Sequence, residues 1–163
     1  MLNYKQGNIL QGLASGEASL IAHQENCEGL NYFHGVAKAI HDATEGLTER
    51  HVLICKEDDT FGNILVHNNV VNLYSQRYRG GLKSSGIDTY ENRNICLENA
   101  LIKLKQHMET LDNPILGIPL IASGLASNLK LKGDMSDLEY FKIYVAPIVE
   151  KILYDKNIIV YYL

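Results

Sequence analysis

The sequence contains no tryptophan, and only three prolines and three cysteines among its 163 residues. The cysteines, Cys27, Cys55 and Cys96, are odd in number and widely spaced, which fits neither a disulfide framework nor a zinc-binding cysteine pattern. No two of the six histidines lie four residues apart, so no helix face presents a histidine pair to a metal. We therefore expect a reducing compartment, no bound metal and no cofactor.

The chain also lacks an apolar run long enough for a membrane span, and its start has no basic segment followed by an apolar core. The formal net charge is -4, so the overall charge gives no reason to expect nucleic-acid binding. We expect a cytoplasmic protein without membrane or nucleic-acid partners. Basic clusters such as Lys130 with Lys132 are interpreted as solvated surface. The sequence gives no indication of the oligomeric state.

Short apolar runs bounded by polar residues predict the strands of the fold. They lie at Ala18–His23, Val52–Cys55, Gly62–His67, Val70–Tyr74, Ile115–Pro119 and Asn157–Leu163. Asn68 and Asn69 favour a hairpin, because asparagine tolerates positive φ.

Apolar residues at helical spacing predict three helices. They run from Val36 to Leu47, from about Tyr90 to Leu111 and from Leu138 to Ile152. Asp88 followed by Glu91, and Ser136 followed by Glu139, resemble helix-capping pairs. Pro147 should kink or divide the last helix, since proline lacks the N–H and clashes with the preceding turn.

The alternation of strands and helices indicates an α/β fold, with helices covering both faces of a central mixed sheet in three α/β/α layers. The length suits one domain, residues 1–163. The segment Tyr74–Asp88, rich in glycine, serine and arginine, is the main irregular stretch. We interpret it as a surface loop.

Three segments follow or open predicted strands and carry residues suited to ligand binding: Gly7–Leu10, Ala22–Ile40 and Pro119–Ser127. In the second segment a strand gives way to a loop and then to a helix that starts at Gly35. A helix start presents free backbone N–H groups and a positive dipole end, which suit a phosphate. Ligands of open α/β sheets lie at the carboxyl ends of the strands, so these loops are expected to converge on one site.

The chain contains, in order, GNI (7–9), AHQENCEG (22–29), GVA (35–37), NLYSQ (72–76), TYE (89–91), IP (118–119) and ASGL (122–125). This ordered set resembles the macro domain family. The match is closest to the branch of ADP-ribose-1″-phosphatases and terminal ADP-ribose protein glycohydrolases. The resemblance implies a three-layer macro domain that binds ADP-ribose or a derivative.

The chain departs from the family pattern in its loops. The phosphate loop, Gly29–Gly35, is one residue longer and lacks the second glycine, and Ala122 replaces the first glycine of the third loop. The glycohydrolase lysine nucleophile would fall near Gln76. Ala126 stands where that enzyme has its catalytic aspartate, and Asp134 is the nearest acidic residue.

The resemblance implies roles for three groups of residues. Adenine would lie near the first turn, which contains Gly7, Asn8 and Ile9. The diphosphate would lie at the helix start, formed by Gly35, Val36 and Ala37. The second phosphate and the distal ribose would lie at the third loop, with Ser123, Gly124 and Leu125. Asn26 would hydrogen-bond the distal ribose. Each group also has a structural interpretation: Asn8 could cap a turn, and Asn26 could hold its own loop.

Three residues are candidates for catalysis: Asn26, His34 and Asp134. A histidine titrates near neutral pH, so His34 could serve as general acid or base, although it could equally be an exposed loop residue. The leading hypothesis is hydrolysis of ADP-ribose-1″-phosphate to ADP-ribose. The alternatives are a non-catalytic binding module, with Tyr32, Phe33 and His34 stacking on the ligand, and a scaffold whose site those rings close.

Overall fold

The computed structural model describes residues 1–29, 33–57, 59–82 and 86–163. These residues form a six-stranded sheet in the order β1-β6-β5-β2-β4-β3. The strands are β1 (Leu2–Gln6), β2 (Leu20–Asn26), β3 (Ile64–His67), β4 (Val70–Gln76), β5 (Ile115–Pro119) and β6 (Asn157–Tyr162). All neighbouring pairs are parallel except β3 with β4, so the sheet is mixed, as predicted.

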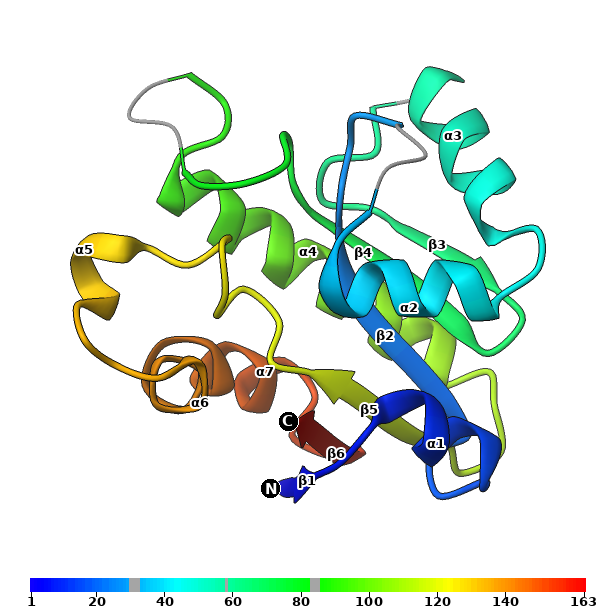
Figure 1. Ribbon diagram of the computed structural model, residues 1–163. Helices are drawn as coiled ribbons and strands as arrows, with labels where there is room; N and C mark the ends of the chain where they lie inside the picture. Colours follow the sequence, from blue (N-terminus) through cyan, green and yellow to red (C-terminus); the bar gives the residue numbers. More distant parts are fainter. Residues whose placement is uncertain (30–32, 58, 83–85) are drawn as a thin grey trace.

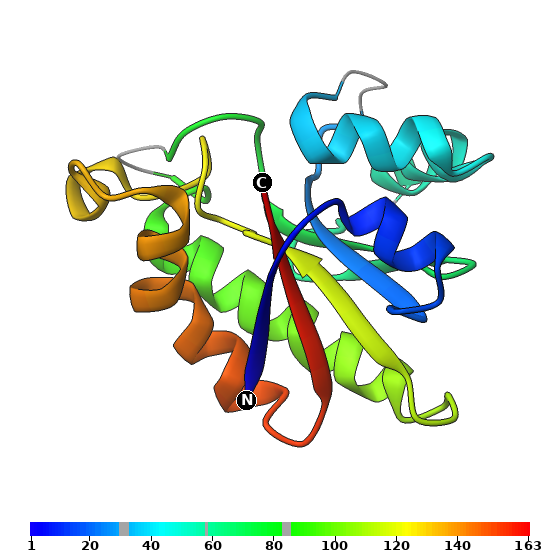
Figure 2. The same cartoon turned by 60° about the horizontal axis from the view of Figure 1, so that its bottom comes forward.

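Helices cover both faces of the sheet (Figures 1 and 2). One face carries α1 (Ile9–Ala14), α2 (Gly35–Ala43) and α3 (Leu47–Glu57). The other carries α4 (Tyr90–Met108), α6 (Asp137–Tyr140), the π-helical turn η1 (Phe141–Val145) and α7 (Ala146–Ile152), with the short α5 (Leu129–Lys132) at its rim. The predicted three-layer α/β/α fold is confirmed.

Alternation along the strands divides the interior into two cores. On β2, Leu20 and Ala22 join the core beneath α4 and α7, whereas Ile21 joins the core beneath α1, α2 and α3. Successive side chains of a strand point to opposite faces of the sheet, so residues two apart share a face. This alternation determines which side chains of β2 reach the candidate site described below.

Three local predictions are confirmed: the strand near the end of the chain, the hairpin turn and the second capping pair. The chain ends in β6, which lies between β1 and β5, and Asn68 adopts φ 53° in the tight β3–β4 hairpin. Ser136 and Glu139 form a capping box at the start of α6. The three cysteines are free. No helix in the described part of the chain is long and apolar enough to span a membrane.

The predicted strand Val52–Cys55 is wrong, because these residues belong to helix α3. The run is apolar, yet Leu53 is 56% exposed, and the buried positions of the helix are Leu47 and His51. A short apolar run does not by itself separate strand from helix. The helix predicted from Val36 to Leu47 is likewise divided, since α2 ends at Ala43 and Leu47 starts α3.

One helix start differs from the sequence interpretation, and one predicted helix division is confirmed. Thr89, not Asp88, caps α4, with its hydroxyl accepting a hydrogen bond from the backbone N–H of Asn92. Asp88 is buried instead and pairs with Arg93. In the last helical stretch, the π-helical turn η1 ends directly before α7, whose second residue is Pro147. Proline cannot continue the regular hydrogen-bond ladder, so the predicted division occurs there.

Candidate functional site

A cleft of about 1100 Å³ opens at the carboxyl ends of the parallel strands. Asn26, Gln76, Pro119 and Tyr162, the last residues of β2, β4, β5 and β6, all line it. Other parts of the wall come from the turn at residues 7–10, the start of α2, and residues 120–122 and 124–126 of the third loop. The three segments singled out in the sequence therefore converge on one cavity, at the position expected for an open α/β sheet.

The first turn leads directly into helix α1. Gly7, Asn8 and Ile9 line the cleft. The Asn8 side-chain oxygen accepts a hydrogen bond of 2.8 Å from the backbone N–H of Leu10 and so caps the helix. The structure thus assigns Asn8 the capping interaction that the sequence left as an alternative, at the edge of the cleft.

Asn26 ends β2 and also lines the cleft. Its side-chain oxygen accepts a hydrogen bond of 3.0 Å from the backbone N–H of Glu28, and its amide nitrogen donates to Glu25 Oε1 at 3.4 Å. These bonds hold the loop after β2. An amide group has two N–H donors and two acceptor lone pairs. Asn26 therefore keeps capacity for a ligand while fixing its own loop.

Helix α2 points its start at the cleft. His34 precedes the helix in extended conformation and makes no side-chain capping bond, while Gly35, Val36 and Ala37 form the first turn; all four line the cleft. Gly35 has φ 54°, a left-handed conformation that favours glycine. No acidic residue stands in this first turn. The helix start thus offers N–H groups and a positive dipole end to an anion.

The structure describes part of the altered phosphate loop, namely Gly29 and residues 33–35. Leu30, Asn31 and Tyr32, and with them the predicted stacking or site closure by Tyr32, lie outside the described residues. Phe33 and His34, at its end, line the cleft. Phe33 stacks on the ring of His41 with 3.6 Å between centroids. At least one aromatic ring of this loop therefore packs on the protein itself.

In the third loop, Ala122 replaces a family glycine and adopts φ 58°, a glycine-like conformation. Its N–H donates to the side chain of Gln24 at 2.9 Å. Gly124 and Leu125 line the cleft, but Ser123 is fully buried and its hydroxyl donates to the Ile121 carbonyl at 3.1 Å. The structure therefore brings two of the three predicted residues of this loop to the cavity.

Asp134 is exposed and is not among the residues that line the cleft. The acidic residue that does line it from this region is Asp137, at the start of α6. Lys132 forms an ion pair with Asp137, and its ammonium also donates to the Ser123 carbonyl at 2.7 Å. The sequence did not indicate Asp137, because its position at the cleft and its ion pair with Lys132 depend on how the loop before α6 folds back.

The loop after β4 contributes Arg79 and Gly80 to the cleft, next to Gln76 at the end of the strand. A buried ion pair fixes it: Arg93 donates to both oxygens of Asp88, at 2.8 and 2.6 Å. Arg93 also donates to the carbonyl of Gly80 at 3.1 Å. Burial alone would raise the pKa of Asp88, but the hydrogen bonds from Arg93 and from the backbone outweigh it and lower that pKa. The pair holds the loop against α4.

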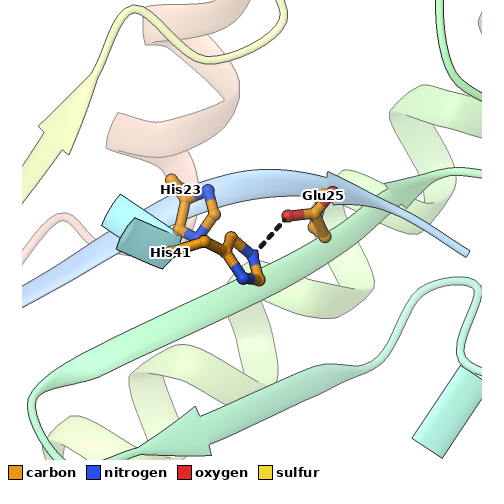
Figure 3. A group of neighbouring side chains, drawn as sticks. All are labelled: His23, Glu25 and His41. Carbon is orange, nitrogen blue, oxygen red and sulfur yellow. Dashed lines mark hydrogen bonds and ion pairs between the residues drawn. The ribbon is translucent and has the colours of Figure 1, made fainter. Parts of the chain in front are cut away.

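Beneath α2, buried polar side chains gather on the sheet (Figure 3). His41 Nε2 lies 3.0 Å from Glu25 Oε2, and His23 Nε2 lies 2.8 Å from the Asn72 side-chain oxygen. Burial lowers the pKa of His23 and of His41 to about 4, so both rings are neutral at neutral pH. Burial also raises the pKa of Glu25. The spacing of histidines in the sequence gave no sign of this cluster.

No protein-family model and no curated protein sequence matches the chain, but solved structures match its full length. A protein of unknown function from Bacteroides thetaiotaomicron superposes with a TM-score of 0.72 at 20% identity, covering 100% of this chain and 98% of that one. The macrodomain of Thermus aquaticus DarG gives 0.67 at 17% identity, with 100% and 99% covered. Thermosipho africanus DarTG in complex with ADP-ribose gives 0.65 at 14% identity, with 98% and 41% covered.

At these identities the comparison establishes the fold and nothing finer. The chain has the macrodomain fold, since the structural match extends along the whole chain. The fold consists of the mixed sheet and its two helical layers, with the cleft at the strand ends.

Proposed function

We propose that the cleft binds ADP-ribose or a close derivative. The observation that carries the proposal is the start of α2, where the N–H groups of Gly35, Val36 and Ala37 open on the same cavity as the first turn and the third loop. A diphosphate bears negative charge along its length, and a helix start stabilises such charge. The macrodomain fold of a structure solved with ADP-ribose adds support.

The size and lining of the cleft agree with a ligand that has two sugars and a base. At about 1100 Å³ the cleft is slightly larger than typical small-molecule sites, which measure about 300–1,000 Å³. In this proposal the adenine lies near Asn8 and Ile9, and the distal ribose lies between Asn26 and the loop with Gly124 and Leu125. The bonds within its own loop use one N–H and one oxygen lone pair of the Asn26 amide. The remaining N–H and lone pair then hydrogen-bond a ribose hydroxyl.

The first experiment is calorimetric titration with ADP-ribose, with AMP as the control ligand. We expect saturable binding of ADP-ribose and much weaker binding of AMP. In Asn26→Ala the affinity for ADP-ribose should fall about tenfold, the effect of one or two lost hydrogen bonds. Asn157→Ala is the matched control, because Asn157 is exposed at the start of β6, the opposite end of that strand from the cleft.

Equal affinity for AMP and ADP-ribose would contradict the placement of the distal ribose. Failure of the wild-type protein to bind ADP-ribose would contradict the proposal itself and favour a scaffold with a closed site. Unchanged affinity in Asn26→Ala would remove Asn26 from the ligand site.

The finer proposal is hydrolysis of ADP-ribose-1″-phosphate to ADP-ribose. His34 supports it, since this residue lines the cleft directly before the helix start that would hold the phosphates. A histidine there serves as general acid toward the leaving oxygen or as general base toward water. Of the other catalytic candidates, Asn26 lines the cleft, whereas Asp134 does not, so the proposal rests on Asn26 and His34.

Release of inorganic phosphate from ADP-ribose-1″-phosphate tests this step. We expect turnover by the wild-type protein and a loss of about 100-fold in kcat for His34→Ala, the lower range for removal of a general acid or base. The matched control is His107→Ala, because His107 lies on α4, away from the cleft-lining residues. Tight binding of ADP-ribose without any turnover would instead identify a non-catalytic binding module.

A further inference from the structure

Three buried side chains meet between β2 and α2: His23, Glu25 and His41 (Figure 3). Their exposed fractions are 1%, 3% and 5%. One ring nitrogen of each histidine and one carboxylate oxygen lie within 4.8 Å of one another. The backbone explains the meeting, because His23 and Glu25 are two apart on a strand and share a face, and α2 packs over that face.

One ring nitrogen of His23 is hydrogen-bonded and the other is not. Its Nε2 lies 2.8 Å from the Asn72 side-chain oxygen, which is held in that orientation by the Asn72 amide donating to Tyr74. An amide oxygen only accepts, so Nε2 carries the proton and Nδ1 carries a lone pair. Nδ1 is buried and has no hydrogen-bond partner. A buried acceptor without a partner is unfavourable, and so points to a ligand.

His41 and Glu25 are oriented in the same way. Nδ1 of His41 lies 3.0 Å from the Thr48 hydroxyl, and Nε2 faces Glu25 Oε2 at 3.0 Å. The second carboxylate oxygen of Glu25 accepts the backbone N–H of Asn26 at 3.1 Å. Each of the three side chains thus has an outer partner that fixes its ring or carboxylate, an arrangement typical of metal ligands.

We propose that His23, Glu25 and His41 form a binding site for a divalent transition metal, with zinc as the preferred ion. Two imidazoles and one carboxylate are a known ligand set for zinc, with a fourth position left open. Zinc bonds of about 2.0–2.2 Å require ligand atoms about 3.4 Å apart. The pair His41–Glu25, at 3.0 Å, is close to this spacing. The third ligand atom lies within 4.8 Å of the other two, so metal binding requires side-chain rotations that draw it closer.

The binding step is balanced by proton release. As the ion takes His41 Nε2 and Glu25 Oε2, the proton held between these two atoms leaves to solvent, because ligands bind metals in their deprotonated forms. His41 stays neutral, with a proton on Nδ1 that it donates to the Thr48 hydroxyl. His23 and Glu25 also line the cleft, so the ion lies beside the proposed ADP-ribose site. Phe33 stacks on His41 at 3.6 Å and adds apolar cover. The inference does not require ADP-ribose binding, and its test contains no ADP-ribose.

The test begins with protein stripped by a chelator and titrated with zinc chloride against a chromogenic zinc indicator. We expect one zinc per chain. His23→Gln and Glu25→Gln should each weaken zinc binding by more than about 100-fold, since loss of an outer partner alone costs about 10–100-fold. His67→Gln is the control, because His67 is a half-buried histidine bonded to the Glu45 carbonyl and should bind zinc as the wild type does. Circular dichroism of the metal-free variants checks that they fold.

Cobalt substitution distinguishes this site from a neighbouring one. Cys55 Sγ lies 3.8 Å from His51 Nδ1, so a thiol could compete for the ion. Tetrahedral cobalt bound by nitrogen and oxygen shows visible bands without a thiolate charge-transfer band, and that is the spectrum we expect. A thiolate band, unchanged zinc affinity in Glu25→Gln, or no stoichiometric zinc in the wild type would each overturn the proposal. A wild-type protein that takes no zinc but binds ADP-ribose would leave the proposed function intact.

Discussion

The two faces of the central sheet differ in what they bury. Toward α4 and α7, the strands bury an almost wholly apolar core, with Leu20 and Ala22 contributed by β2. Toward α2 and α3, the same strand contributes His23 and Glu25, and β4 contributes Asn72. On β2, the buried polar side chains thus lie toward α2, where His23 and Glu25 follow Ile21 on the same face.

The face toward α4 contributes mainly to stability, and the face toward α2 contributes polar groups next to the cleft. Apolar burial stabilises a fold by about 25 cal/mol per Å², whereas buried polar groups contribute little net stability and are costly when unpaired. The cluster under α2 therefore has no evident role in stability, and it adjoins the cleft. We expect substitutions on the α4 face to change the free energy of unfolding most, and substitutions near the cleft to change binding most.

The largest effect is expected for Phe141→Ala. Phe141, on η1, is fully buried in the apolar core on the α4 side of the sheet and packs edge-on against Tyr4, with 6.3 Å between ring centroids. Its removal leaves a cavity and should lower the free energy of unfolding by about 4 kcal/mol, measured by urea denaturation. Ile143→Ala, on the same turn but 53% exposed, should change it by less than about 1 kcal/mol. Equal losses in the two variants would contradict the assignment of stability to the buried apolar side chains of this core.

The next effect is expected where the two regions meet. Arg93→Ala leaves the buried carboxylate of Asp88 without its cation and should cost about 3 kcal/mol. It should also weaken ADP-ribose binding, because Arg93 holds the loop that brings Gly80 to the cleft. Arg77→Ala is the control: its pair with Asp59 is exposed, so the loss should be below about 1 kcal/mol. A stable Arg93→Ala variant with normal affinity would mean that the loop is held by other contacts.

Much of the fold could be predicted from the sequence, because its signals are local. The hydrophobic stripe of α4 and the apolar run of β6 determine their elements within a few residues. The strand predicted at Val52–Cys55 failed, because the apolar residues of α3 are mostly half-buried or exposed and follow no clear stripe. The short helix α1 was missed, since only the capping asparagine, Asn8, marks its start.

The candidate site could be predicted only in part. Its loops follow strands, so their convergence at the strand ends is a consequence of topology. The cluster of His23, Glu25 and His41 depends on how α2 lies over β2, and no spacing along the chain encodes that contact. The alternation of His23 and Glu25 on one strand was a usable signal, but it predicts only that the two side chains share a face.

The smallest effect is expected for Ala122 in the third loop. Its backbone has a left-handed conformation that favours glycine over a residue with a side chain. Alanine at φ 58° costs about 1–2 kcal/mol, and glycine loses about 0.4–1 kcal/mol through unfolded-state entropy. Ala122→Gly should therefore raise the free energy of unfolding by about 0.5 kcal/mol and leave ADP-ribose binding unchanged. Ala126→Gly, in the same loop but without positive φ, should lower it by a similar amount. If Ala122→Gly is destabilising instead, the Ala122 methyl group, which packs against the α4 core, outweighs the backbone strain.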